Sequence, residues 1–262
     1  MRLAMIAAFV VRLFAAALPP AHAADVPPYQ AATALAHAAL ADAQSGGILG
    51  LRPHVADIER ALAGGRQAID DAAAHGTMLT DGLGETITAM AISSKSGKNA
   101  ISVANPYPVL ALYLGSYYNE VGQSEDALRV MTLGLTLFVT GDLHLGDHWA
   151  DLMYERGAAL VALKRYGEVL AAYDEIEKLP NLDKATQARI WRSRGFILTE
   201  QGRLLEAEAA YHKSLEIEPN NDRALHELAY IEKLKAGGER QPGGLAPVQP
   251  QTTPQSESKP TH

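Results

Sequence analysis

The chain has 262 residues, of which 47% are hydrophobic and 20% are charged, a balance typical of a soluble protein of one or two domains. Its formal net charge is −7 and it has no lysine- or arginine-rich run, so nucleic acid is not an expected partner. It contains no cysteine, which excludes disulfides, thiol catalysis and cysteine-ligated metals.

Residues 1–23 have the pattern of a cleaved export signal. A short basic start, Met1-Arg2, precedes a mostly apolar run over residues 3–18, and Ala21-His22-Ala23 is a small-x-small cleavage site. Arg12 interrupts the apolar run, so the alternatives are an uncleaved membrane anchor or a misassigned start, although the run is short for a bilayer span. We expect cleavage after Ala23, a periplasmic or secreted product, and no stable membrane insertion afterwards.

Residues 24–107 predict an irregular, mainly helical segment. Residues 29–44 and 54–75 have helical spacing, with Gly64-Gly65 loosening the second helix, and together they could cover the open end of the helix pairs that begin at residue 108. The β-branched clusters Thr86-Ile87-Thr88 and Ala100-Ile101-Ser102-Val103 flank Ser96-Gly97-Lys98-Asn99, a plausible turn. This spacing predicts a small β-hairpin, which is marginal without support.

Residues 108–236 repeat one helix-pair pattern three times. Its clearest mark is a glycine in the middle of each first helix, at Gly115, Gly157 and Gly195, with Ala229 in the same place of a fourth, solitary helix. The steps between these marks are 42, 38 and 34 residues. The other marks recur at matched offsets: Tyr118, Gly122 and Ala127 in the first copy, Tyr154, Tyr166, Tyr173 and Pro180 in the second, and Trp191, Gly202, Ala207, Tyr211 and Pro219 in the third.

The offsets predict how the two helices of a pair meet. Because glycine inside a helix costs about 1 kcal/mol relative to alanine, its recurrence predicts a close approach of the second helix, with Ala127, Val169 and Ala207 as the facing residues. Gly122 and Gly202 are expected to end their first helices in a left-handed conformation. Lys164-Arg165 takes this place in the middle copy and weakens its turn signal.

These spacings resemble the tetratricopeptide repeat, whose period is about 34 residues. The resemblance covers about half of the chain and implies an all-α fold, an α-solenoid of three helix hairpins closed by a capping helix over residues 222–235. It also implies a role in binding other proteins. Residues 237–262 are rich in Gly, Pro, Gln, Ser and Thr and are expected to be a disordered tail.

In the proteins that this chain resembles, the first helix of each pair lines a concave groove. Matching repeat positions give the candidate peptide-binding residues of this chain: Tyr154, Arg189, Arg192, Phe196, Arg223, His226 and Tyr230. The arginines would suit an acidic peptide segment or a terminal carboxylate. The alternative is that they are solvated helix residues with partners such as Glu227, four residues after Arg223.

One segment raises the question of a metal site. Asp142, His144, Asp147, His148 and Asp151 lie close together in the sequence. Gly141 and Gly146 favour a loop there, with Asp147 near the start of the next helix as a capping residue, so no metal and no cofactor are predicted.

We therefore predict a non-catalytic, exported adaptor or scaffold that binds a protein or peptide. The alternative is a cell-envelope enzyme, or a subunit of one, with a site near residues 80–105 and 142–151. A third hypothesis is a scaffold that self-associates through the ends of the solenoid.

Overall fold

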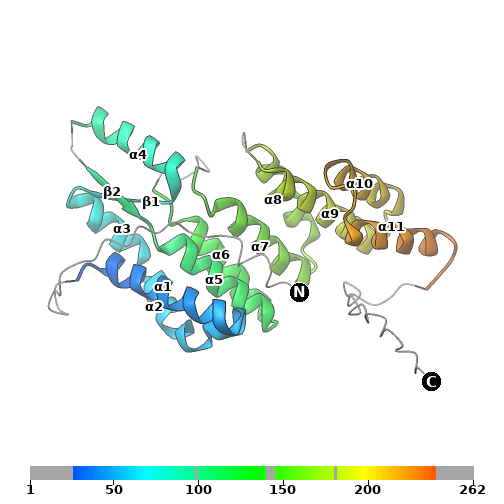
Figure 1. Ribbon diagram of the computed structural model, residues 1–262, viewed down its shortest axis with the longest axis horizontal. Coiled ribbons are helices and arrows are strands. Elements are labelled where there is room, and N and C mark those ends of the chain that lie inside the picture. The colour runs from blue at the N-terminus through cyan, green and yellow to red at the C-terminus, as the bar shows by residue number, and fades with distance from the viewer. Residues whose placement is uncertain (1–25, 98–99, 140–144, 180–181, 240–262) are drawn as a thin grey trace, which may run out of the picture. The chain divides into compact units, whose positions relative to one another are not determined.

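The computed structural model describes residues 26–97, 100–139, 145–179 and 182–239 (Figure 1). These residues form helices and one pair of short strands, which confirms the predicted all-α class. The predicted export signal and most of the predicted tail lie outside the described residues. Within the described part, every helix is too short or too polar to cross a lipid bilayer.

The chain divides into two compact units, Met1–Leu182 and Asp183–His262. The boundary falls inside the solenoid that the sequence predicted as one domain. The first two helix pairs belong to the first unit, and the third pair and the solitary helix belong to the second. The second unit has a hydrophobic core of its own, which includes Leu198, Tyr211 and Ile231.

The first unit begins with four helical segments: α1 (Pro28–Gly46), the 3-10 helix η2 (Ile48–His54), α2 (Val55–Ala63) and α3 (Gly65–Ala74). Proline fits the first turn of α1, because its fixed φ is helical and its missing N–H would have no helical partner there. The predicted second helix is divided in two at Gly64. As expected, α1, η2 and α2 cover one end of the repeats, packing against α5 (Tyr107–Glu120).

Between α3 and α5 lies a β-α-β unit of β1 (Thr77–Thr80), α4 (Gly82–Lys95) and β2 (Ile101–Ala104). The strands are parallel, with Thr77 opposite Ile101. The predicted β-hairpin is wrong, because Thr86-Ile87-Thr88 are helical and the partner of β2 precedes them. Parallel strands need a crossover, which α4 provides. The Glu85 carboxylate accepts the Asp81 N–H at 2.6 Å, which stabilises the first turn of α4. This contact favours a helix although the β-branched residues 86–88 prefer strands.

Hydroxyl groups and flanking helices support the two short strands. The Thr80 hydroxyl of β1 lies 2.7 Å from that of Thr86 in α4 and 2.6 Å from that of Ser102 in β2. Both α3 and α4 pack on β1, and Figure 1 shows the strands between these two helices. A two-stranded sheet is marginal alone, so this cover explains why it persists here.

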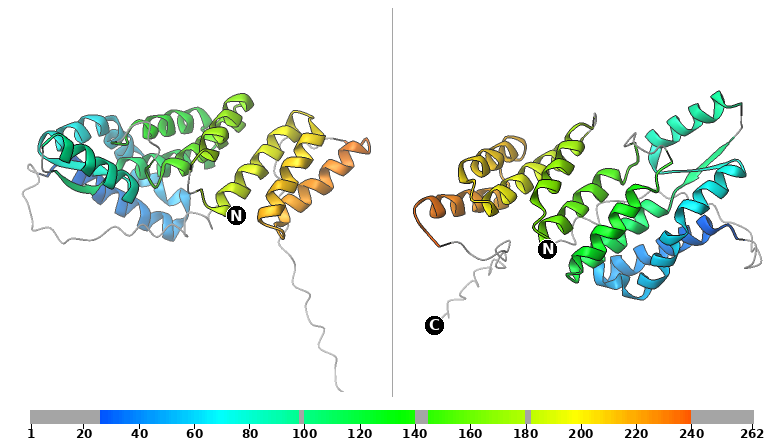
Figure 2. Two further views of the ribbon diagram at one scale, coloured as in Figure 1. Left: turned by 90° about the horizontal axis from the view of Figure 1, so that it is seen from above. Right: turned by 180° about the vertical axis from the view of Figure 1, so that it is seen from behind.

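The remaining helices of the first unit are two antiparallel pairs, α5 with α6 (Ser124–Leu135) and α7 (Trp149–Ala162) with α8 (Tyr166–Glu177). The second unit consists of α9 (Lys184–Glu200), α10 (Leu204–Ile217) and α11 (Asp222–Lys235) (Figure 2). The side chains of Asp183 and Asn221 accept backbone N–H groups at the starts of α9 and α11. The predicted capping helix over 222–235 is confirmed.

The turn inside each pair is the same in all three copies. Gly122 and Gly202 have φ of 77° and 76°, and Lys164 takes the same left-handed region at 57°. The residue that follows each of them donates its N–H to a carbonyl five residues back, at 2.8, 2.9 and 2.8 Å respectively. The middle copy therefore keeps the turn although it lacks the glycine.

The mid-helix glycines allow the close approach that the sequence predicted, but the facing residues differ. A Cβ at Gly115, Gly157 or Gly195 would meet the side chain 16 positions later, namely Met131, Tyr173 or Tyr211. The prediction of Ala127, Val169 and Ala207 as these neighbours is wrong by one helical turn. Those three residues are fully buried on the same face, four positions earlier.

Candidate functional site

Six of the seven candidate groove residues lie in the second unit, on α9 and α11. The two helices contact each other, and both pack against α10. Arg223 and His226 are exposed, whereas Arg189, Arg192, Phe196 and Tyr230 are half-buried. The unit therefore presents cationic and aromatic side chains together, and none of the six is fully buried.

Arg192 is already engaged within the unit. Its Nη1 lies 2.5 Å from Oε2 of Glu218 and 3.2 Å from the Ser214 hydroxyl, and its side chain is only 18% exposed. Both partners lie at the end of α10 or just after it. Arg192 therefore holds α9 against α10, and its charge is balanced before any ligand arrives.

Acidic groups also belong to this region. The pKa of Glu227 in α11 is raised by burial and by the charge of Glu200, although its hydrogen bond with Tyr211 opposes the rise. Burial and the charge of Glu227 raise the pKa of Tyr211 in turn. The surface of α9 and α11 is therefore of mixed charge, less basic than the sequence count implied.

The opposite flank of α9 carries a cation–π cluster. Lys213 Nζ lies 4.1 Å from the ring centroid of Trp191, and the Arg194 guanidinium carbon lies 5.4 Å from it. Such contacts stabilise exposed aromatic rings modestly. Trp191 thus belongs to the contact between α9 and α10.

Tyr154, the seventh candidate, is on α7 in the first unit. Its ring stacks on that of Tyr173, with centroids 6.0 Å apart and an interplanar angle of 25°. Tyr173 is the residue that faces Gly157, so Tyr154 extends the packing of α7 on α8. It is half-buried.

The two segments named for the enzyme alternative do meet. His148 Nδ1 lies 2.6 Å from Oδ1 of Asp81, and the His148 backbone N–H donates to the other carboxylate oxygen at 2.8 Å. Sequence reasoning did not find Asp81, although an aspartate just before a helix was a visible signal. Asp142 and His144 lie outside the described residues.

The environment of this pair is that of a structural contact. Burial lowers the pKa of His148, but the hydrogen bond and charge of Asp81, with Asp151 and Asp147, outweigh burial and raise it. Burial and the charge of Asp81 raise the pKa of Asp147. The side chains of His148 and Asp81 are only 11% and 5% exposed, which leaves little for a substrate to reach. Among the described residues, no group of three or more potential ligands could hold a metal ion.

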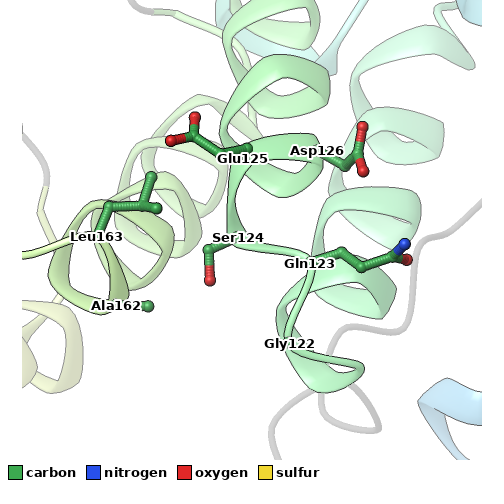
Figure 3. A pocket seen from close by; sticks show the side chains of 7 residues that line it. All are labelled: Gly122, Gln123, Ser124, Glu125, Asp126, Ala162 and Leu163. Carbon is green, nitrogen blue, oxygen red and sulfur yellow. The ribbon is translucent and has the colours of Figure 1, made fainter.

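A shallow hollow of about 420 Å³ lies where the turn after α5 approaches the end of α7 (Figure 3). Figure 3 shows Glu125 and Asp126 at its rim, and Asp126 is paired with Arg129 at 3.1 Å. The lining contains no lysine or arginine, so this hollow differs from the basic groove that the sequence predicted. Its lining residues are Gly122, Gln123, Ser124, Glu125, Asp126, Ala162 and Leu163.

Comparison with known families bears on the second unit. The tetratricopeptide repeat family model matches residues 188–221, which hold most of α9, all of α10 and the turn before α11. The chain contains a tetratricopeptide repeat. Counted from the start of the match at Ala188, Arg189, Arg192 and Phe196 are its second, fifth and ninth residues. No curated protein matches the chain.

Tetratricopeptide repeats generally mediate contacts between proteins and are typically scaffolds without catalytic activity. In this chain, the first two helix pairs share the turn and the glycine packing of the matched repeat. Sequence reasoning did not place Glu218 in the site, because its relation to Arg192 depends on how separate helices pack.

Proposed function

We propose that this protein is an exported adaptor that binds a segment of another protein on the inner helices of its tetratricopeptide repeats. The observation that carries the proposal is the phase of the family match. Counted from the first matched residue, Ala188, the candidate residues of α9 fall at the positions from which the resemblance predicts a groove, and one period of about 34 residues later is the first residue of α11. The residues at these positions are accessible, as a binding surface requires.

The side chains indicate a ligand that combines carboxylate and apolar groups. Arg223 is exposed on α11, and Arg189 is half-buried on α9, so each of the two helices carries a guanidinium group. Phe196 and Tyr230 add aromatic surface, which is enriched at protein interfaces. An acidic peptide segment or a terminal carboxylate fits this set, and Glu200 and Glu227 disfavour ligands of uniformly negative charge.

Site-specific photo-crosslinking tests the groove. A photoreactive phenylalanine analogue at Phe196 or Tyr230 would be compared with the same analogue at Leu205, which is 75% exposed on α10. We expect one partner to be captured from Phe196 and Tyr230 and not from Leu205, with less capture after Arg223→Ala. Equal capture from Leu205, or capture unaffected by Arg223→Ala, would reject the proposed surface.

Export is the second part of the proposal, and it depends on residues 1–23. Amino-terminal sequencing of the protein recovered from the cell envelope or the medium tests it, with Ala24 expected as the first residue. A chain that retains Met1 and stays with the cytosolic fraction would contradict export and leave the groove unaffected.

A further inference from the structure

Helix α4 has the reverse of the usual polarity. Its buried face consists of Glu85, Ala89 and Ser93, which are polar or small. The opposite face carries three large apolar side chains that are 72%, 60% and 52% exposed, and we call them the α4 seam: Leu83, Ile87 and Met90. Soluble helices normally bury such residues, so a contiguous exposed set marks a contact surface.

The neighbours of α4 fix the direction of the seam. On one flank, a Cβ at Gly84 would lie 3.0 Å from the carbonyl oxygen of Leu145, so the segment before α7 covers that side. On the other flank, the Thr86 hydroxyl lies 2.7 Å from that of Thr80 in β1 and 3.3 Å from that of Ser102 in β2, so this flank faces the sheet. With about 100° between successive residues, Met90 and Leu83 lie about 40° and 60° around the helix from Thr86, whereas Ile87 lies about 60° from Gly84. Connections between neighbouring parallel strands are right-handed in nearly all proteins, and in that hand this flank of α4 lies toward β2. Leu83 and Met90 of the seam therefore lean toward the β2 side.

Strand β2 has an open edge on that same side. In the described sheet the strand order is β1-β2, and Ile101 and Asn105 donate their N–H groups to β1 or to the residue just before it. Alternate residues of a strand point the other way, so the backbone groups of Ser102 and Ala104 face away from β1. Proteins usually protect such edges with charge or proline, and β2 contains neither.

We propose that β2 and the α4 seam pair with their counterparts in a second copy of this chain, across a two-fold axis. Antiparallel pairing of the two β2 edges would give a sheet of four strands with both α4 helices on one face. Each α4 packs on its own β1 and β2. Two strand spacings then separate the helices by about 10 Å, the distance at which helices pack through their side chains.

Charge favours a second copy as the occupant. Among the described residues from Gly82 to Ala104, only the buried Glu85 and the exposed Lys95 are charged. Two copies of an acidic chain can therefore approach here without repulsion, although the whole chain carries −7. The seam and a four-residue edge fall short of the roughly 800 Å² per partner of standard interfaces, so the dimer should dissociate on dilution.

Sedimentation velocity of the full chain over a concentration series tests the dimer. We expect the mass to rise toward that of two chains, and Leu83→Glu to weaken association by at least about tenfold. Leu205→Glu is the matched control, because Leu205 is also the second residue of its helix and is 75% exposed. A chain that is monomeric throughout, or equal effects of the two variants, would overturn the proposal.

Crosslinking locates the contact, since the natural chain has no cysteine. Met90→Cys should form a disulfide-linked dimer under mild oxidation, because Met90 is the seam residue nearest to the β2 flank, and Leu205→Cys should not. Ala104→Pro removes an N–H that points away from β1 and should weaken association while α4 and β1 stay folded. Equal crosslinking at both positions, or association unchanged by Ala104→Pro, would contradict the two-fold pairing.

Discussion

Gly195 lies directly against the ring of Tyr211, so that a Cβ at position 195 would come within 2.7 Å of Cε2. Tyr211 is 2% exposed and cannot move aside without disturbing the core of the second unit. Gly157 and Tyr173 form the equivalent contact in the first unit, where the nearest atom is the ring hydroxyl at 3.1 Å. The two glycines thus have the same role in helix packing, but position 157 leaves more room for a side chain than position 195.

Gly195→Ala should destabilise the second unit by roughly 1–2 kcal/mol, because overpacking outweighs the gain in helix propensity. Gly157→Ala should be close to neutral, because a contact of 3.1 Å needs only a small shift of Tyr173. Urea unfolding measures both. The chain has two tryptophans, so Trp149→Phe leaves Trp191 as the reporter of the second unit, and Trp191→Phe leaves Trp149 for the first. Equal losses for the two variants would contradict the geometry.

Lys164→Gly should stabilise the first unit by about 0.5–1 kcal/mol, because a left-handed conformation costs a lysine more than a glycine. Lys164 has φ of 57°, whereas the other two copies have glycine there. Gly202→Ala is the reverse change and should destabilise the second unit by about 1 kcal/mol. Urea unfolding followed by Trp149 and Trp191 measures them, and a loss of stability in Lys164→Gly would show that its aliphatic stem matters more than its φ.

Stability of the first unit should fall as pH rises above about 6.5, the ordinary pKa of histidine. The pKa of His148 is raised in the folded chain by its hydrogen bond to Asp81 and by the charge of Asp81. The folded state therefore gains its full stabilisation from charged His148 below the ordinary pKa, and this stabilisation is lost as the pH rises from there through the higher pKa of the folded state. Thermal unfolding followed by Trp149, adjacent to His148, measures this. Asp81→Asn removes the charge responsible, so its pH slope should be flatter, and an unchanged slope would refute the assignment.

Arg192→Ala should lower the stability of the second unit by roughly 1–3 kcal/mol, because it removes the cation paired with Glu218 and leaves that carboxylate with only its hydrogen bond from Asn221 among the contacts described. Arg223→Ala should change stability by less than about 0.5 kcal/mol, since Arg223 is exposed. Denaturant unfolding separates the two variants. If Arg192→Ala proves as mild as Arg223→Ala, the ion pair with Glu218 is not formed in solution.

The sequence predicted the helix pairs well because their signals are local. Glycine in the turn, asparagine before α11 and the recurring mid-helix glycine each act on their own few residues. The strands were harder to predict. β1 has four residues without a regular alternation of polar and apolar side chains, and its partner strand follows 24 residues later. No local sequence pattern near Thr77 therefore predicts the pairing.

The candidate site was predictable as a set of positions and not as a set of charges. The resemblance to the repeat pointed to Arg189, Arg192 and Phe196, and the family match covers all three residues, while their role in binding stays a prediction. The pairing of Arg192 with Glu218 joins residues 26 positions apart on different helices, and sequence spacing does not encode it. For the same reason the His148 pair with Asp81, 67 positions away, was not predicted.

Ala229 stands in α11 where the three complete pairs have glycine, and it is exposed. A methyl group is tolerated there because, among the described residues, α11 is not followed by a second helix that would press on it. Engineering a longer array by adding a helix beyond α11 would therefore require Ala229→Gly first, together with a buried partner sixteen residues further on, as Tyr211 is to Gly195.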